Sequence, residues 1–124
     1  MVVAEYIRHN RINPLEDEDL LRTWCSGWSM PDLDTWQEHQ EHMMQAGFEH
    51  LKAEDVTGHV SPSLHKLFRM SKSLLGLGKI LHFTKIRNDV MHGNQLASVA
   101  QYKALAKNLW YYCIYTACKP IVSL

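Results

Sequence analysis

One carboxylate interrupts the apolar run at residues 1–7 (MVVAEYI). The continuous hydrophobicity of this run predicts a buried parallel strand, in which Glu5 is the only charged side chain. A carboxylate near the end of a buried strand costs free energy unless it has a partner or a task. Because open parallel sheets bind ligands at the carboxyl ends of their strands, Glu5 is a candidate functional residue. A structural salt bridge from Glu5 to Arg8 or Arg11 is the alternative interpretation.

Tryptophan and basic side chains provide a second group of candidates. Trp24 and Trp28 are one helical turn apart and could line an apolar substrate pocket, although tryptophans at this spacing more often pack a core. Phe68 belongs to the apolar stripe of a later predicted helix, and His65 and Arg69 lie four residues apart on a neighbouring face.

Eight histidines raise the question of a metal site. His39 and His42 share one face of a predicted helix, with Glu38 and Glu41 beside them. A solvated helix face is the commoner explanation of these residues, and no further ligand stands at a firm spacing. We therefore predict no metal-binding residues.

Two catalytic signatures are weak or missing. Gly76-Leu77-Gly78 is the only G-x-G in the chain, follows a helical pattern, and has Leu81 where a third glycine would stand. This motif predicts a helix break and not a dinucleotide-binding loop. A Ser-His-Asp or Cys-His site stays open, although no nucleophile lies in a strand-turn-helix elbow.

The clearest structural signals lie in residues 28–57. Thr35 is a predicted N-cap and Glu38 completes a T-x-x-E capping box. Gly47 suits the left-handed position after a helix, and residues 48–56 then alternate as in a strand. A helix that leads into a strand through one glycine is typical of α/β folds.

The remaining elements are predicted around this unit. Pro14 and four acidic residues behind it begin a helix over 14–27. After a turn at Gly58-His59, helices are expected within 62–107, the first beginning at Pro62, with a separate piece at 79–83 and a second break at 92–94. Residues 109–117 give the strongest strand signal.

Together the patterns predict one α/β domain over residues 1–124, with about three strands (1–7, 48–56 and 109–117) and four to five helices.

Composition limits the possible functions. The chain has 13 Lys and Arg against 13 Asp and Glu, so a general nucleic-acid binder is not expected. No apolar run is long enough for a membrane span, and the N-terminus lacks a signal-peptide pattern. The three cysteines form neither a C-x-x-C pair nor an even framework, which is typical of reduced thiols in a cytoplasmic protein.

A series of short motifs resembles a known family. They are residues 2–6 (VVAEY), 24–28 (WCSGW), 31–33 (PDL), 46–48 (AGF), 55–57 (DVT), 60–63 (VSPS) and 110–120 (WYYCIYTACKP). Their order and spacing resemble the C-terminal half of class I small-molecule methyltransferases that depend on S-adenosylmethionine, of the sterol, tocopherol and polyketide-sugar type.

The resemblance implies a partial Rossmann-like fold, in which the three strands are the fifth, the sixth and the antiparallel seventh strand. Helices 14–27 and 62–107 would form the lid and the acceptor-binding region. Glu5 stands where relatives often have an Asp that orients or deprotonates the acceptor, and is implied to be catalytic. The implied substrate-binding residues are Tyr6, Trp24, Trp28, His65, Phe68 and Arg69.

The family's Gly-rich cofactor loop and ribose-binding carboxylate have no counterpart in the sequence, so no cofactor-binding residue is predicted. The complete enzyme would use S-adenosylmethionine, and this chain alone is expected to be inactive. It would be a fragment, half of a split enzyme, or a remnant, with a complementing half or a second copy as partner. The alternative is a non-catalytic α/β module that binds a small ligand or a protein. The acceptor, and whether C, O or N is methylated, stay open.

Overall fold

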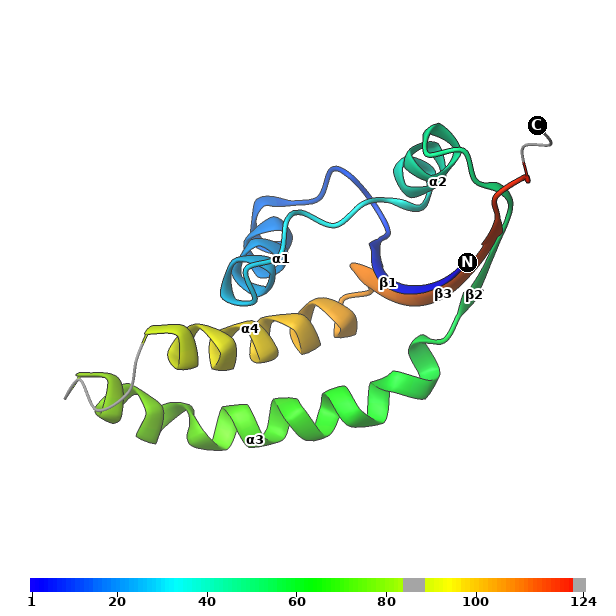
Figure 1. The fold of residues 1–124 in the computed structure, drawn as a ribbon. Helices are drawn as coiled ribbons and strands as arrows, with labels where there is room; N and C mark the ends of the chain where they lie inside the picture. The colour runs from blue at the N-terminus through cyan, green and yellow to red at the C-terminus, as the bar shows by residue number, and fades with distance from the viewer. Residues whose placement is uncertain (84–88, 122–124) are drawn as a thin grey trace.

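The structure, a computed structural model, describes residues 1–83 and 89–121. Its elements are, in chain order, β1 (Val2–Arg8), α1 (Leu15–Gly27), α2 (Trp36–Gln45), β2 (Glu49–Asp55), α3 (Thr57–Phe83), α4 (Asp89–Ala106) and β3 (Trp110–Cys118) (Figure 1). The predicted class is confirmed, because the described chain is an α/β fold with three strands and four helices.

The three strands form one sheet in the order β1-β3-β2, and β3 is antiparallel to both neighbours. β1 and β2 therefore run in the same direction without touching. Cys113, on the central strand, faces Glu5 on one side and Asp55 on the other.

The prediction that residues 1–7 form a buried parallel strand is wrong. β1 pairs along its length only with the antiparallel β3, apart from one parallel bridge from Arg8 to Thr35, and is an edge strand of the described sheet. Most of its N-terminal half is exposed, and Val2 retains 70% of its accessible surface. Apolar composition did not distinguish a strand with two neighbours from one whose other edge is open.

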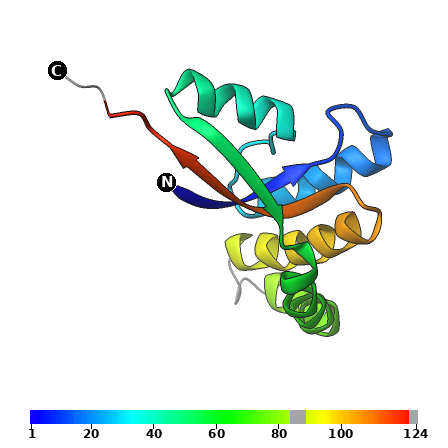
Figure 2. The ribbon, with the colours of Figure 1, turned by 90° about the vertical axis from the view of Figure 1, so that its right-hand side faces the viewer.

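Helices cover the two faces of the sheet unequally. On one face, α1 and α4 bury Trp24 and Ala104 in a core with Trp110 of β3. On the other face, Trp36 of α2 stacks on Tyr115 with 5.1 Å between ring centroids. Figure 2 shows α2 on one side of the strands and the α3–α4 pair on the other.

The local signals around α2 are confirmed. The Thr35 hydroxyl accepts from the Glu38 N–H, and the Glu38 carboxylate accepts from the Thr35 N–H, which completes the capping box. Gly47 has a φ of +82° immediately before β2, a conformation that glycine adopts without a Cβ penalty.

The predicted boundaries of the next two helices are wrong. α3 begins at Thr57, where the Asp55 carboxylate accepts from both the backbone N–H and the hydroxyl of Thr57, so Gly58 and His59 are helical. Pro62 lies inside α3, and the helix continues through 76–78 and includes 79–83. Residues 92–94 do not break α4, which begins at Asp89.

The contact between α1 and α4 requires a glycine at the end of α1. A Cβ placed on Gly27 would lie 2.6 Å from both the Ala97 Cβ and the Gly93 carbonyl oxygen. The two helix backbones therefore approach each other closely at this point. The glycine that this contact requires is Gly27, because a Cβ on Gly93 would lie no closer than 3.8 Å to Gly27.

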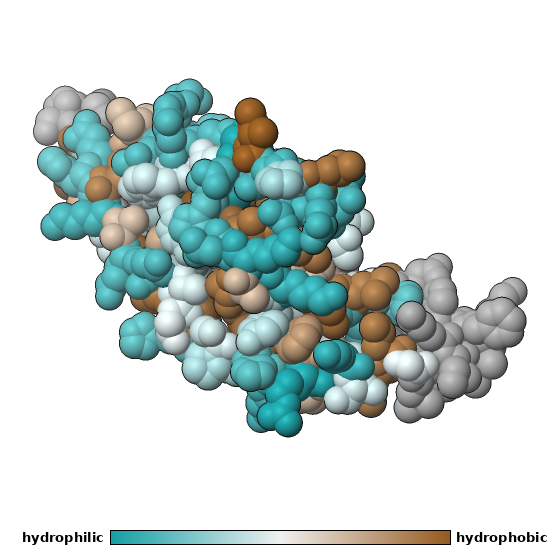
Figure 3. Space-filling model, turned by 180° about the vertical axis from the view of Figure 1, so that it is seen from behind, coloured by the Kyte–Doolittle hydropathy of each residue, from teal (hydrophilic) through white to brown (hydrophobic). Residues whose placement is uncertain are grey.

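Several large hydrophobic side chains remain exposed. Seen from behind, hydrophobic surface is interspersed with hydrophilic surface and is prominent toward the end where α3 finishes and α4 begins (Figure 3). The exposed large hydrophobic residues of α3 and α4 include Met70, Leu74, Val90 and Met91. Within the described residues, no helix combines the length and apolar character that crossing a bilayer requires.

Candidate functional site

A cleft of about 430 Å³ lies where β1 meets the loop before α2. Glu5 and Tyr6 of β1 form one wall, and His39 of α2 contributes from the other side. The loop between α1 and α2 supplies the rest of the lining, which is Met30, Pro31, Asp32, Leu33 and Asp34. The cleft thus combines an apolar wall with carboxylates and one imidazole, the kind of lining that ligand sites show.

Glu5 lies in this cleft without a cationic partner among the described residues. Its Oε1 accepts a 3.2 Å hydrogen bond from the backbone N–H of Tyr6, and its side chain is exposed. The alternative prediction of a salt bridge to Arg8 or Arg11 is wrong, because both arginines pair elsewhere. Glu5 is therefore available to interact with a ligand.

Arg8 organises the loop beneath the cleft. Its side chain is 2% exposed and donates to Asp32 at 3.0 Å and to Glu18 of α1. It also donates to the carbonyl oxygens of Asn10 and Arg11. A buried guanidinium needs such a complete set of acceptors, and here the acceptors come from three segments of the chain.

Arg11 extends this network to the helix that carries His39. Its guanidinium donates to Asp32 and to the Glu38 carboxylate at the start of α2. The hydrogen bond from Arg11, together with that from the Thr35 N–H, lowers the pKa of Glu38 to about 2. These bonds hold the first turn of α2 in place through Glu38, the residue that precedes His39.

His39 provides the nitrogen base of the cleft. Its ring stacks on Tyr115 with a centroid distance of 4.5 Å, and its Nε2 is buried without a hydrogen-bond partner among the described residues. An unpartnered buried polar atom carries a desolvation cost that a ligand or an ordered water would relieve. Nearby, Asp34 bonds His42 Nδ1 at 2.8 Å.

Tyr6 joins the cleft to the aromatic core. Its ring makes edge contacts with Trp24 at 5.0 Å and Trp110 at 5.3 Å. Burial raises the pKa of Tyr6 above its ordinary value, so the phenol is neutral at physiological pH. Tyr6 can therefore donate a hydrogen bond but does not act as a phenolate.

The two tryptophans predicted to bind substrate lie in the aromatic core and not in the cleft. Trp24 has no exposed surface and packs against Trp110, with Trp28 half-buried beside it at 6.1 Å. Neither residue lines the Glu5 cleft. In this structure they support the wall of the site from the core.

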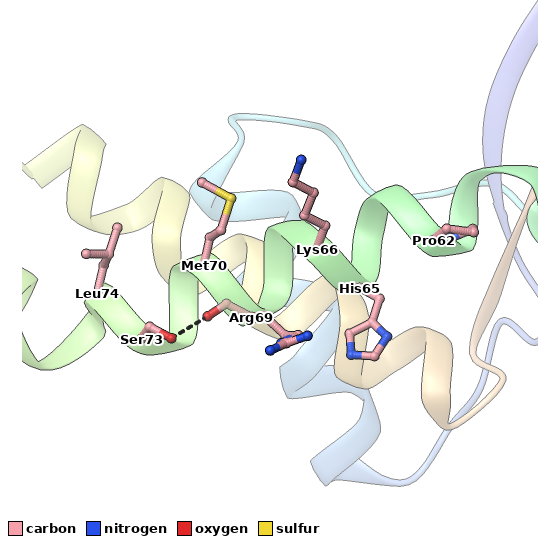
Figure 4. Close-up of a pocket in the computed structure, with 7 residues that line it drawn as sticks. All are labelled: Pro62, His65, Lys66, Arg69, Met70, Ser73 and Leu74. Carbon is pink, nitrogen blue, oxygen red and sulfur yellow. Dashed lines mark hydrogen bonds between the residues drawn. The ribbon is translucent and has the colours of Figure 1, made fainter.

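The predicted α3 residues belong to a different surface. His65 and Arg69 line a groove on α3 (Figure 4). Phe68 and His65 both stack on Tyr102 of α4, at 4.5 Å and 5.3 Å between ring centroids. The predicted set is thus divided between the cleft (Glu5 and Tyr6), the core around Trp24 and Trp28, and α3. Sequence reasoning missed His39 as a cleft residue and treated its helix face as solvated.

Thiol and metal chemistry are not favoured by the described residues. Burial raises the pKa of Cys25 to about 11 and also raises that of Cys113, which disfavours their nucleophilic thiolates. Among residues 1–83 and 89–121, no group of three His, Cys, Asp or Glu side chains is arranged to hold a metal ion.

Comparison with solved structures finds a similar fold in two structures of phosphoethanolamine N-methyltransferase 2 from Haemonchus contortus. One is a complex with phosphomonomethylethanolamine and S-adenosylhomocysteine, with a TM-score of 0.56. The other is a complex with S-adenosyl-L-methionine, with a TM-score of 0.54. Each is 13% identical and matches 97% of this chain but 26% of its own.

No family model and no curated protein matches the sequence. The two solved structures show that the chain has the fold of about a quarter of an S-adenosylmethionine-dependent methyltransferase. The resemblance inferred from the motifs is confirmed for the fold only. The more specific sterol, tocopherol or polyketide-sugar type stays a prediction.

Proposed function

We propose that this chain is the acceptor-binding part of an S-adenosylmethionine-dependent methyltransferase that acts on a small molecule. The observation that supports this is the match of almost the whole chain to one part of such an enzyme, with all three strands included. Because the matched enzyme is about four times as long, the cofactor would be held by residues outside this chain or by a complementing chain.

The acceptor would lie in the Glu5 cleft. Tyr6, Met30, Pro31 and Leu33 offer it apolar contact, which suits the expected apolar or polycyclic body. S-adenosylmethionine, when bound, supplies an electrophilic methyl group. Glu5 would orient the acceptor atom and take up the proton that an O–H, N–H or C–H acceptor releases. His39, which lines the same cleft, would contact the acceptor through its ring.

The test requires the protein in its cellular context, because the chain is expected to need a cofactor-binding partner. The tagged chain is purified from the cells that produce it and supplied with S-adenosylmethionine carrying a ¹³C-methyl group and a small-molecule extract. The expected result is a labelled small molecule, formed only when the chain is present.

Two variants relate this activity to the cleft. Glu5→Gln preserves size and removes the charge, and should lower the rate about a hundredfold if Glu5 is an acid–base residue. Glu54→Gln, at an exposed position of β2, is the matched control and should leave the rate unchanged. If Glu5→Gln and wild type transfer label equally, the assigned role is wrong. If no labelled product forms but a small molecule is retained, the chain is a non-catalytic binding module.

A further inference from the structure

The outward face of α3 concentrates positive charge that the proposed function does not use. Between Thr57 and Phe83 the sequence has four Lys or Arg and three His, and no Asp or Glu. The whole chain has equal numbers of acidic and basic residues, 13 of each. Charge is thus distributed unevenly, and α3 is a basic helix in a formally neutral chain.

Apolar side chains accompany these cations. Lys66, Met70 and Leu74 project on one side of the helix at intervals of four residues, while His65 and Arg69 project on the other (Figure 4). Met70 is 54% exposed and Leu74 is 48% exposed. These residues line a groove of about 600 Å³. All of its lining residues come from α3, so no second element encloses it.

The cations of this face are not neutralised within the described residues. Arg8, Arg11, Arg22 and Lys107 all form ion pairs with carboxylates, whereas no ion pair involves Lys66 or Arg69. Lys72, outside the groove, lies over the Phe68 ring, 5.7 Å from its centroid. The groove face therefore presents two unpaired cations, Lys66 and Arg69, to whatever approaches it.

We propose that Lys66 and Arg69, with Met70 and Leu74, form a docking surface for an anionic phospholipid bilayer. A helix lying in the bilayer interface places cations against lipid headgroups and apolar side chains at the acyl boundary. One helix face provides few contacts for a small free phosphate. A bilayer satisfies both the charged and the apolar residues without requiring a shaped partner.

The test measures co-sedimentation of the chain with vesicles of phosphatidylcholine containing about 30% phosphatidylserine, beside pure phosphatidylcholine vesicles. The expected result is binding to the anionic vesicles that weakens as salt is raised, since exposed charges are screened. Equal binding to both vesicle types, or none to either, overturns the proposal.

Three variants locate the surface. Lys66→Gln with Arg69→Gln should weaken vesicle binding about tenfold or more, since each interfacial cation strengthens binding several-fold. Met70→Ser with Leu74→Ser should also weaken it. The matched control, Lys52→Gln with Lys103→Gln, removes two exposed cations from β2 and α4 and should bind as wild type. Circular dichroism melts establish that each variant folds. Equal binding by the α3 variants and the control contradicts the assignment.

Two competitors separate other ligands from a bilayer. Millimolar glycerol phosphate should not release the chain from vesicles, and release would indicate a discrete phosphate site instead. Polyglutamate should compete only weakly at physiological salt. Stable binding to polyglutamate without binding to vesicles would assign the face to an acidic protein partner and overturn the proposal.

Discussion

The Arg11 guanidinium donates two hydrogen bonds to the carboxylate of Glu38, the same group that closes the capping box with Thr35. One side chain therefore performs two tasks. It satisfies the first turn of α2, and it ties that helix to the loop that follows β1. The position of His39 in the cleft depends on this ion pair between Arg11 and Glu38.

The depressed pKa of Glu38 predicts a specific acid dependence. The folded-state value of about 2 lies below the ordinary 4.5, so the stabilisation is complete above about pH 4.5 and is lost as pH falls toward 2. Glu38→Gln should melt at a lower temperature than wild type at pH 7, and the difference should disappear near pH 2. Thermal melts across this range measure it. Glu41→Gln, on the same helix, is the control, and a pH-independent difference would contradict the mechanism.

The capping box itself predicts a stability loss. Thr35→Ala removes the hydroxyl that accepts from the Glu38 N–H and should lower the free energy of unfolding by about 1 kcal/mol. Urea unfolding followed by circular dichroism measures the change. Thr23→Ala, at an exposed position within α1, should change stability little. If both substitutions have the same effect, the cap contributes nothing.

Gly27 and Gly76 should respond oppositely to alanine. Gly27→Ala places a methyl group 2.6 Å from Ala97 and from the Gly93 carbonyl, and this overpacking should cost about 1–3 kcal/mol. Gly76 lies in α3 with no atom within 4 Å of a built Cβ, so Gly76→Ala should stabilise the helix by up to about 1 kcal/mol. Unfolding midpoints compare the two variants. A neutral Gly27→Ala would show that α1 and α4 are not closely packed.

The three cysteines should differ in reactivity. Cys25 and Cys113 are buried with raised pKa values, whereas Cys118 is exposed. With a pKa of about 11, only about one Cys25 thiol in a thousand is ionised at pH 8. Iodoacetamide at pH 8 should modify Cys118 first and reach the other two only on unfolding, as peptide mass spectrometry would show. Rapid labelling of Cys25 in the folded chain would refute its burial.

The open edge of β1 predicts self-association of the chain on its own. An unpaired strand edge with exposed Val2 can pair with a second chain, and zero formal charge opposes this only weakly. Light scattering after size exclusion should find dimers or larger species at tens of micromolar. Val2→Lys should shift the chain toward monomer, whereas Ile12→Lys, at an exposed position outside the sheet, should not. A well-folded wild-type monomer would contradict the prediction.

Local signals located α1, α2, β2 and β3 because each depends on residues close in sequence. The Thr35–Glu38 box and Gly47 define α2 and its exit without reference to the rest of the chain. The wrong predictions concern residues whose structural role is set by contacts with residues far away in the sequence. The need for glycine at position 27 comes from Gly93 and Ala97 of α4, and the partners of Arg8 are 10 and 24 residues away. His39 was missed as a cleft residue for the same reason, since the other wall belongs to β1.

The central position of β3 has a consequence for how the chain folds. β1 and β2 contact the sheet only through β3, and the N-terminal amine of Met1 bonds the Ala117 carbonyl across 116 residues. Neither outer strand can pair within this sheet until β3 has been synthesised, so sheet formation is expected to wait for the last of the three strands. Pairing over such a separation closes a long loop and is therefore slow. During that interval α2, with its self-contained cap, is the best candidate for early local structure.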